Sequence, residues 1–201
     1  MEPWIPHPTM LTAPGVALLP LDGSMLEPLY HVASDPRIWT HYAYDGSNRE
    51  RFMEIYRASI VDRISQYTFV VQDSVHGRML GSTRFMDIQP RHRKLEIGTT
   101  WYSPDVWGTA LNPTCKFLLL RFAFESLGAL RVTLKTDALN SRSRGAIEKL
   151  GARFEGILRN DMIRDSGTLR HSAYYSILDT EWDAVRDGLL LRVPVLGRDR
   201  I

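Results

Sequence analysis

A glycine lies just before an apolar helical stretch, in a loop that spans residues 103–110. Gly108 allows a close approach between backbone and ligand, and the following helix begins with N–H groups that have no partner within it. These groups stand at the positive end of the helix dipole, which favours an anion. The loop therefore predicts a pyrophosphate site formed by the N–H groups of Thr109, Ala110, Leu111 and Asn112. A turn without a ligand is the alternative.

Two polar residues in regular elements are further candidates for a site. Glu96 belongs to an expected strand over 94–102, in which alternation places Glu96, Gly98 and Thr100 on one face. Asn140 precedes an expected helix over 141–150, where an asparagine commonly caps the first turn. A solvated strand glutamate and a helix cap are the interpretations that involve no ligand.

The histidines and the single cysteine give no pattern for a metal or a nucleophile. The chain has no His-x-x-x-His spacing and no pair of cysteines that would hold zinc. Cys115 lies in an apolar run, where we expect a small buried side chain. Ser143 lacks the Gly-x-Ser-x-Gly surroundings of a hydrolase nucleophile. The sequence therefore predicts no metal and needs no covalent enzyme intermediate.

Length and composition are those of an ordinary globular protein. The 201 residues fit one domain, with an extended lead over 1–14 and a tail over 193–201. A formal charge of +2 is too small for a nucleic-acid binder. The N-terminus shows no targeting signal, and no apolar run reaches the length of a membrane span. We therefore expect a cytoplasmic protein without nucleic-acid or membrane partners.

The elements that must position these residues alternate along the chain. Apolar periodicity predicts strands over 16–21, 67–72, 79–88, 94–102, 129–135, 154–162 and 169–178. Capping residues and breakers predict helices over 24–34, 48–65, 113–127 and 141–150, and a short one from 181. The strands between 67 and 102 form an antiparallel meander, and residues 164–167 give a hairpin turn.

This order of elements over 16–182 resembles the GNAT superfamily of N-acetyltransferases. Residues 107–112, Trp-Gly-Thr-Ala-Leu-Asn, resemble the family's acetyl-CoA pyrophosphate loop, and residues 140–152 resemble its later asparagine-containing helix. Residues 120–131 are similar to the RimJ/RimL-type branch. The resemblance implies a single mixed α/β domain flanked by helices. Its central, mostly antiparallel sheet would splay between the fourth and fifth strands and bind acetyl-CoA there.

The resemblance also assigns residues to the coenzyme, with some departures from the family pattern. It implies that Asn140 contacts the pantetheine arm and that N–H groups near Trp101 and Tyr102 stabilise the thioester oxyanion. The family loop reads Gln/Arg-x-x-Gly-x-Gly/Ala, and its three defined positions hold Trp107, Ala110 and Asn112 here. Ala110 can adopt helical dihedral angles, so we expect phosphate binding to persist.

The resemblance narrows the catalytic groups to two side chains. Ile147 stands where many members carry the tyrosine that protonates the departing thiolate. In RimJ/RimL-type enzymes a serine at the position of Ser143 contacts the coenzyme sulfur instead, although a helix-start serine also satisfies an N–H group. An alkyl amine must lose a proton before it attacks, and the resemblance makes Glu96 the base, directly or through water.

Aromatic residues are the candidates for the acceptor pocket. Trp39, Tyr42 and Tyr44, with Trp101 and Tyr175, are expected to line it, although each also suits ordinary packing. Arg142 and Arg144 are candidates for the coenzyme's phosphates, or else solvated side chains.

The resemblance implies acetyl transfer to a primary amine by direct attack on the thioester. The acceptor would be a protein or peptide N-terminal α-amino group, or a small-molecule amine. A non-catalytic acyl-CoA sensor, suggested by Ile147 and the altered loop, is one alternative. A transferase of another acyl group, such as succinyl, is the other. The family resemblance is also compatible with a homodimer.

Overall fold

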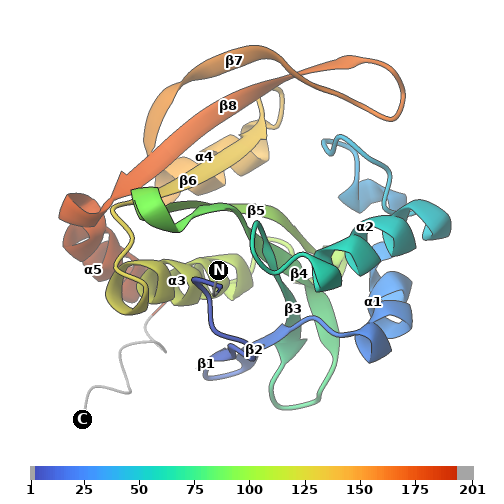
Figure 1. The fold of residues 1–201 in the computed structure, drawn as a ribbon, viewed down its shortest axis with the longest axis horizontal. Helices are drawn as coiled ribbons and strands as arrows, with labels where there is room; N and C mark the ends of the chain where they lie inside the picture. Colours follow the sequence, from blue (N-terminus) through green and yellow to red (C-terminus); the bar gives the residue numbers. More distant parts are fainter. Residues whose placement is uncertain (1–2, 194–201) are drawn as a thin grey trace.

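In the computed structural model, which describes residues 3–193, eight strands form one mixed sheet with helices on both faces (Figure 1). Its strand order is β1-β2-β3-β4-β5-β6-β8-β7, and every neighbouring pair is antiparallel except β5 with β6. The strands are β1 (Leu11–Ala13), β2 (Val16–Pro20), β3 (Tyr67–Asp73), β4 (Met79–Gln89), β5 (Lys94–Tyr102), β6 (Arg131–Asp137), β7 (Arg153–Ile163) and β8 (Leu169–Leu178). The helices are α1 (Leu26–Ala33), α2 (Arg49–Val61), α3 (Leu111–Arg121), α4 (Ser141–Lys149) and α5 (Trp182–Arg192).

The predicted mixed α/β fold is confirmed, and seven of the eight strands lie where periodicity placed them. Strand β1 was missed, because its three residues are too few to show alternation and they lie within the predicted lead. The lead also contributes Ile5 to the core. Of the predicted tail, Val193 is buried and 194–201 lie outside the described residues. Within residues 3–193, no helix is both long and apolar enough to cross a bilayer.

The sheet separates two hydrophobic cores. Helices α3, α4 and α5 pack on one face, where Phe85, Ile97 and Leu134 join their apolar side chains. Helices α1 and α2 pack on the other face, where Val70 and Trp101 meet them. We call these the α3 face and the α1/α2 face. Because successive strand residues point to opposite faces, this division shows which side chains share a side of the sheet.

Strands β5 and β6 pair over only part of their length. Their parallel register runs from Lys94 opposite Arg131 to Ile97 opposite Leu134, whereas β5 continues to Tyr102 and β6 to Asp137. Beyond that register the two strands have no ladder between them, so the facing edge of β5 keeps unpaired backbone groups. The splay that the sequence predicts between its fourth and fifth expected strands, over 94–102 and 129–135, is confirmed, because these strands are β5 and β6.

A β-bulge in β5 changes which residues face which side. Arg84 pairs with Gly98 and Ser82 with Trp101, so β5 holds one extra residue there, and Thr99 has φ +46°. The bulge reverses the alternation. The expectation that Thr100 shares a face with Glu96 and Gly98 is therefore wrong, and the Thr100 hydroxyl lies on the α3 face.

The close pairing beside the bulge depends on Gly81. A Cβ at this position would lie 2.1 Å from the carbonyl oxygen of Trp101, a backbone atom that cannot move aside alone. We expect Gly81→Ala to lower the free energy of unfolding by about 2 kcal/mol or more, as measured by urea denaturation. Gly188→Ala, which adds the same methyl group in open space on α5, should instead leave stability unchanged or raise it by up to about 1 kcal/mol. Equal effects of the two changes would contradict this role.

Candidate active site

The N-terminus of α3 opens beside the unpaired end of β5. Gly108 has φ +77°, which suits glycine, and no side chain caps the helix. Among the described residues, the N–H groups of Ala110 and Asn112 have no hydrogen-bond partner, whereas those of Thr109 and Leu111 make long contacts of 3.4 and 3.3 Å. The predicted cradle therefore has two free donors and two weakly held ones, all near the positive end of the helix dipole.

Trp107 and Arg142 lie against each other where the two strands separate. The indole Nε1 of Trp107 donates to the carbonyl oxygen of Tyr102 at 2.9 Å, which fixes the ring at the end of β5. The Arg142 guanidinium, from the start of α4, lies 4.2 Å from the centre of that ring. An exposed arginine is thus held beside the α3 N-terminus, at a place suited to phosphate. Arg144 is engaged elsewhere, with the hydroxyl of Tyr175.

Helix α4 presents Ser143 and Ile147 on one face, because they are four residues apart. Asn140 caps the helix: its Oδ1 accepts from the Ser143 N–H at 2.9 Å. The Ser143 hydroxyl makes no hydrogen bond within residues 3–193, so it does not serve as the helix cap itself. Ile147 is buried in the core of the α3 face. Ser143 is half-buried above it and keeps a free hydroxyl.

Glu96 is a buried carboxylate on the α1/α2 face of β5. Its side chain is 8% exposed, and Oε2 lies 3.6 Å from Nζ of Lys135 on β6. Burial raises the pKa of Glu96 above its ordinary value, although the Lys135 ammonium opposes this shift. The carboxylate occupies the space over Gly98, where an added Cβ would lie 2.8 Å from Oε1. A carboxylate with a raised pKa at this position is suited to accept a proton.

Asp137 is a second buried carboxylate near the point where β5 and β6 separate, and it forms an ion pair. Its Oδ2 lies 2.5 Å from Nη2 of Arg164 in the turn between β7 and β8. Although burial opposes the effect, the N–H of Leu139 and the Arg164 guanidinium lower the pKa of Asp137. A carboxylate so stabilised in its charged form is a weaker base than Glu96.

Four of the five predicted acceptor-site aromatics form one cluster. The ring centre of Trp39 lies 5.0 Å from that of Tyr42, 5.3 Å from Tyr44 and 5.5 Å from Trp101. The Tyr42 hydroxyl donates to the carbonyl oxygen of Thr100 at the bulge. Tyr175 is not brought to this cluster. It is buried on the α3 face, where its hydroxyl donates to Glu148 of α4 at 2.9 Å.

The β7–β8 hairpin reaches toward the segment that precedes α2 (Figure 1). The N–H of Asp165 in the hairpin turn donates to the carbonyl oxygen of Ala43 at 2.8 Å. The Asp165 carboxylate also pairs with Arg51 of α2 at 3.2 Å. The aromatic cluster therefore lies beneath a contact between two loops that are 120 residues apart in sequence.

A family model described as an acetyltransferase (GNAT) domain matches residues 16–153. The chain belongs to the GNAT family. The match includes the predicted loop at 107–112 and the asparagine-capped helix, and it confirms the RimJ/RimL-like assignment.

Individual relatives of this GNAT protein agree with that assignment. YdaF of Bacillus subtilis, provisionally named a ribosomal N-acetyltransferase, is 30% identical over 107 residues, which cover 53% of this chain and 57% of YdaF. The chain therefore spans little more than half the length of that relative. A GCN5-related N-acetyltransferase from Brucella melitensis is 26% identical with a TM-score of 0.84, covering 92% of this chain and 86% of that one. RimJ of Mycobacterium smegmatis shares the fold, with a TM-score of 0.79 at 17% identity over 96% and 98% of the two chains.

Three buried cations of this GNAT protein, Arg84, Lys116 and Arg170, were missed in the sequence, and two of them lie beside the bulge. Lys116 lies on α3 and donates from Nζ to the Thr100 hydroxyl at 2.6 Å, directly beneath the bulge. Arg84 lies on β4 opposite Gly98. Both of these could have been found in the sequence as a basic residue within an otherwise apolar element, Lys116 in α3 and Arg84 in β4. Within residues 3–193, no three His, Cys, Asp or Glu side chains form a group that could hold a metal.

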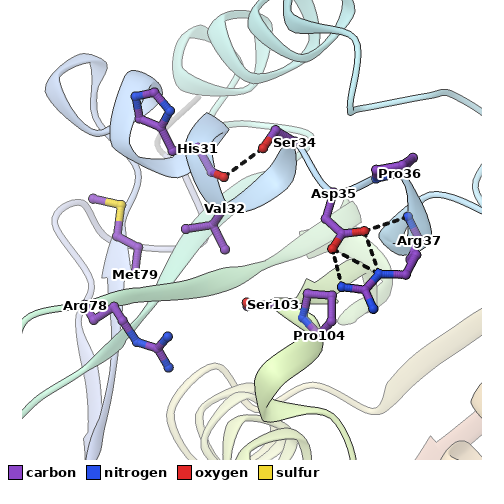
Figure 2. A pocket seen from close by; sticks show the side chains of 10 residues that line it. All are labelled: His31, Val32, Ser34, Asp35, Pro36, Arg37, Arg78, Met79, Ser103 and Pro104. Atoms are coloured by element: carbon purple, nitrogen blue, oxygen red, sulfur yellow. Dashed lines mark hydrogen bonds and ion pairs between the residues drawn. The ribbon is translucent and has the colours of Figure 1, made fainter.

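A surface groove of about 670 Å³ lies apart from these groups, between the end of α1 and the segment that precedes α3 (Figure 2). Two of its arginines are already paired, Arg37 with Asp35 at 2.6 Å and Arg78 with Asp105 at 2.7 Å. Ser103 and Pro104 form one wall of the groove. Because its charges are internally neutralised, the groove is a weaker candidate for an anion than the α3 N-terminus.

Lys116 gives the stability of the protein a specific pH dependence. Burial lowers the pKa of its ammonium to about 8, below the ordinary value of 10.5. Between these values Lys116 binds a proton more readily in the unfolded chain than in the folded one, so its contribution to the free energy of unfolding rises with pH. The buried Cys115 contributes the opposite trend above pH 9, because burial raises its pKa from 9.0 to about 12. The difference in free energy of unfolding between the unmodified protein and Lys116→Met should therefore grow by up to about 3 kcal/mol in urea denaturation series from pH 7.5 to 10.5.

The exposed Lys149 of α4 provides the control for this prediction. Lys149→Met should keep the pH dependence of the unmodified protein, because it leaves the buried ammonium in place. If Lys116→Met and the unmodified protein show parallel curves, Lys116 does not carry a depressed pKa.

Proposed function

We propose that this GNAT protein transfers the acetyl group of acetyl-CoA to a primary amine by direct attack on the thioester. One observation carries the proposal. The unpaired end of β5 lies between free N–H groups at the α3 N-terminus and a buried carboxylate on the α1/α2 face. This arrangement provides a place for a phosphate, an edge for an extended arm and a base.

The residues at the α3 N-terminus fit the coenzyme. Ala110 and Asn112 keep free N–H groups for the pyrophosphate, with Trp107, Gly108, Thr109 and Leu111 in the same turn. The unpaired edge of β5 offers backbone groups to the pantetheine arm, and the N–H groups at Trp101 and Tyr102 would stabilise the oxyanion. RimJ of Mycobacterium smegmatis, which has this fold, was crystallised with CoA-disulfide, which supports the coenzyme assignment.

Proton transfer in the proposed reaction uses two side chains. Glu96 takes a proton from the ammonium of the acceptor, directly or through water, and the neutral amine attacks the thioester carbonyl carbon. The carbon–sulfur bond then breaks. The free hydroxyl of Ser143 gives its proton to the departing sulfur and regains one from the attacking nitrogen, which ends as a neutral amide. Ile147 carries no proton and contributes packing alone.

The acceptor is a protein or peptide N-terminal amine or a small-molecule amine. YdaF is provisionally named for ribosomal substrates. A spermidine N-acetyltransferase from Vibrio cholerae, which shares the fold at 20% identity and a TM-score of 0.70, was crystallised with CoA and spermine. These acceptors differ in size and charge, so the pocket of this chain must decide between them.

Acetyl transfer is tested by release of free CoA from acetyl-CoA across a panel of peptides, amino acids, polyamines and aminoglycosides. The proposal requires turnover with at least one amine. Binding of acetyl-CoA without turnover across the panel would favour the acyl-CoA sensor. Faster turnover with succinyl-CoA would favour the transferase of another acyl group.

Glu96→Gln should remove the base while preserving the shape of the side chain. We expect kcat to fall by about 10²-fold or more. In the unmodified enzyme, kcat should rise with pH through a pKa above the ordinary glutamate value, because only the carboxylate accepts a proton. The variant should lose this limb of the pH–rate profile. Glu54→Gln, on the exposed surface of α2, is the control, and an unaltered profile in Glu96→Gln would exclude Glu96 as the base.

Ser143→Ala should slow departure of the thiolate without weakening coenzyme binding. We expect kcat to fall at least tenfold, while the Kd for acetyl-CoA from calorimetry stays within about twofold, because the lost contact strengthens as the sulfur gains charge. Ser141→Ala, at an exposed position on the same helix, should keep full turnover. Full turnover in Ser143→Ala would remove the serine from the mechanism.

A further inference from the structure

Six described residues have buried polar side-chain atoms without a hydrogen-bond partner: Tyr44, Thr68, Arg84, Asp161, Arg170 and Ser172. All six lie on the α1/α2 face or in the loop that covers it. Arg170 and Ser172 alternate along β8 with Tyr174, whose ring faces Lys135 on that side. Buried polar atoms are nearly always paired in folded proteins, so this concentration indicates a polar ligand on this side of the sheet.

Arg84 has the most unpartnered atoms of the six residues, two against one in each of the others. The residue is 6% exposed, its guanidinium lies over the ring of Tyr56, and its single described partner is the neutral side chain of Gln66 at 2.7 Å. Nε and Nη2 remain without partners. A buried guanidinium without a carboxylate costs several kcal/mol relative to a paired one. A ligand anion would offset that cost.

Apart from Glu96, which lies two residue pairs along the β4–β5 ladder, the neighbours of Arg84 supply hydrogen-bond donors. Thr68 pairs directly with Arg84 across β3 and β4, and its hydroxyl is unpartnered. The Tyr44 hydroxyl is also unpartnered. Burial raises the pKa of Tyr44, and the positive charge of Arg84 opposes this shift. A guanidinium with two hydroxyls matches the acceptor-rich oxygens of a carboxylate.

Arg84 lies beside the proposed base. It is opposite Gly98 in the β4–β5 ladder, and the Glu96 carboxylate covers Gly98. Neighbouring strands are about 4.8 Å apart, so one small molecule can place its amine at Glu96 and an anionic group at Arg84. Gly98 has no side chain of its own, and the Met86 sulfur lies over it, 2.7 Å from the position of an added Cβ. An acceptor that reaches both groups would displace this flexible side chain.

We propose that the acceptor is a primary amine that also carries a carboxylate, and that Arg84 binds this carboxylate with the hydroxyls of Tyr44 and Thr68. This inference rests on the proposed acetyl transfer and specifies its substrate class. Arg170 adds a second buried guanidinium with an unpartnered Nε on the same face. A polyamine, which carries only positive charge, would be repelled by these arginines.

The carboxylate of the acceptor could be the α-carboxylate of a free amino acid or an acidic side chain of a peptide. Pairs of substrates that differ in one of these groups distinguish the two. Free amino acids and their α-amides differ only in the carboxylate of a small acceptor. Peptides with Asp or Asn after the N-terminal residue differ only in an acidic side chain. We expect the carboxylate member of one series to have a kcat/KM at least tenfold above its amide, and polyamines to be poorer acceptors than either.

Arg84→Met tests the residue itself. It should raise KM for the preferred carboxylate acceptor by about ten- to hundredfold, the range for loss of a charge-assisted contact. Activity with the matched amide should change by less than about threefold. Tyr44→Phe, which removes only a hydroxyl, should show a smaller loss in the same direction and serves if Arg84→Met folds poorly. Arg121→Met, an exposed arginine over the ring of Phe117, is the control and should change neither value.

The outcomes separate this inference from the proposed function. Turnover that favours amides or polyamines, or equal effects of Arg84→Met on both members of a pair, would overturn the carboxylate assignment while leaving acetyl transfer intact. A thermal-shift titration with amino acids and their amides, in the presence of CoA, measures acceptor binding without turnover. One outcome would keep the carboxylate site and reject acetyl transfer. In it, amino acids raise the melting temperature of the unmodified protein but not of Arg84→Met, and no amine in the panel releases CoA.

Discussion

Strands β5 and β6 share a short parallel ladder that ends at Ile97 and Leu134, and the candidate site lies where that ladder stops. Continued pairing would use the backbone groups of β5 for the sheet and close the space between the strands. The ladder ends beside the bulge at Thr99, where a β-branched residue adopts φ +46°, a conformation that costs about 1–2 kcal/mol. The fold accepts that strain next to an edge that a ligand can use.

The same region contains three buried ionisable groups. Lys116 lies beneath the bulge, Glu96 lies on the opposite face, and Arg84 stands beside Gly98. Each is buried, and burial penalises the charged form of each group. Apolar residues would pack in these places at lower cost. Their concentration around one opening therefore indicates selection for chemistry at some expense of stability.

The sequence predicted the architecture well and the details of the site less well. Strand periodicity, the asparagine cap at Asn140 and the glycine at 108 are local signals, and they gave the order of elements and the α3 N-terminus. The bulge at Thr99 has no local signal, so the faces of Thr100 and Trp101 could not be assigned by alternation. Tyr175 was grouped with the acceptor aromatics for its residue type, and only the strand order shows that it faces α4.

The central claim is that the opening between β5 and β6 binds acetyl-CoA with its pyrophosphate at the α3 N-terminus. The most direct measurement is a titration of the isotope-labelled protein with acetyl-CoA, followed by NMR of its backbone amides. The account predicts one coenzyme per chain, with the largest shifts at Ala110, Asn112 and the unpaired edge of β5. Absence of binding, or shifts confined to another surface, would contradict it.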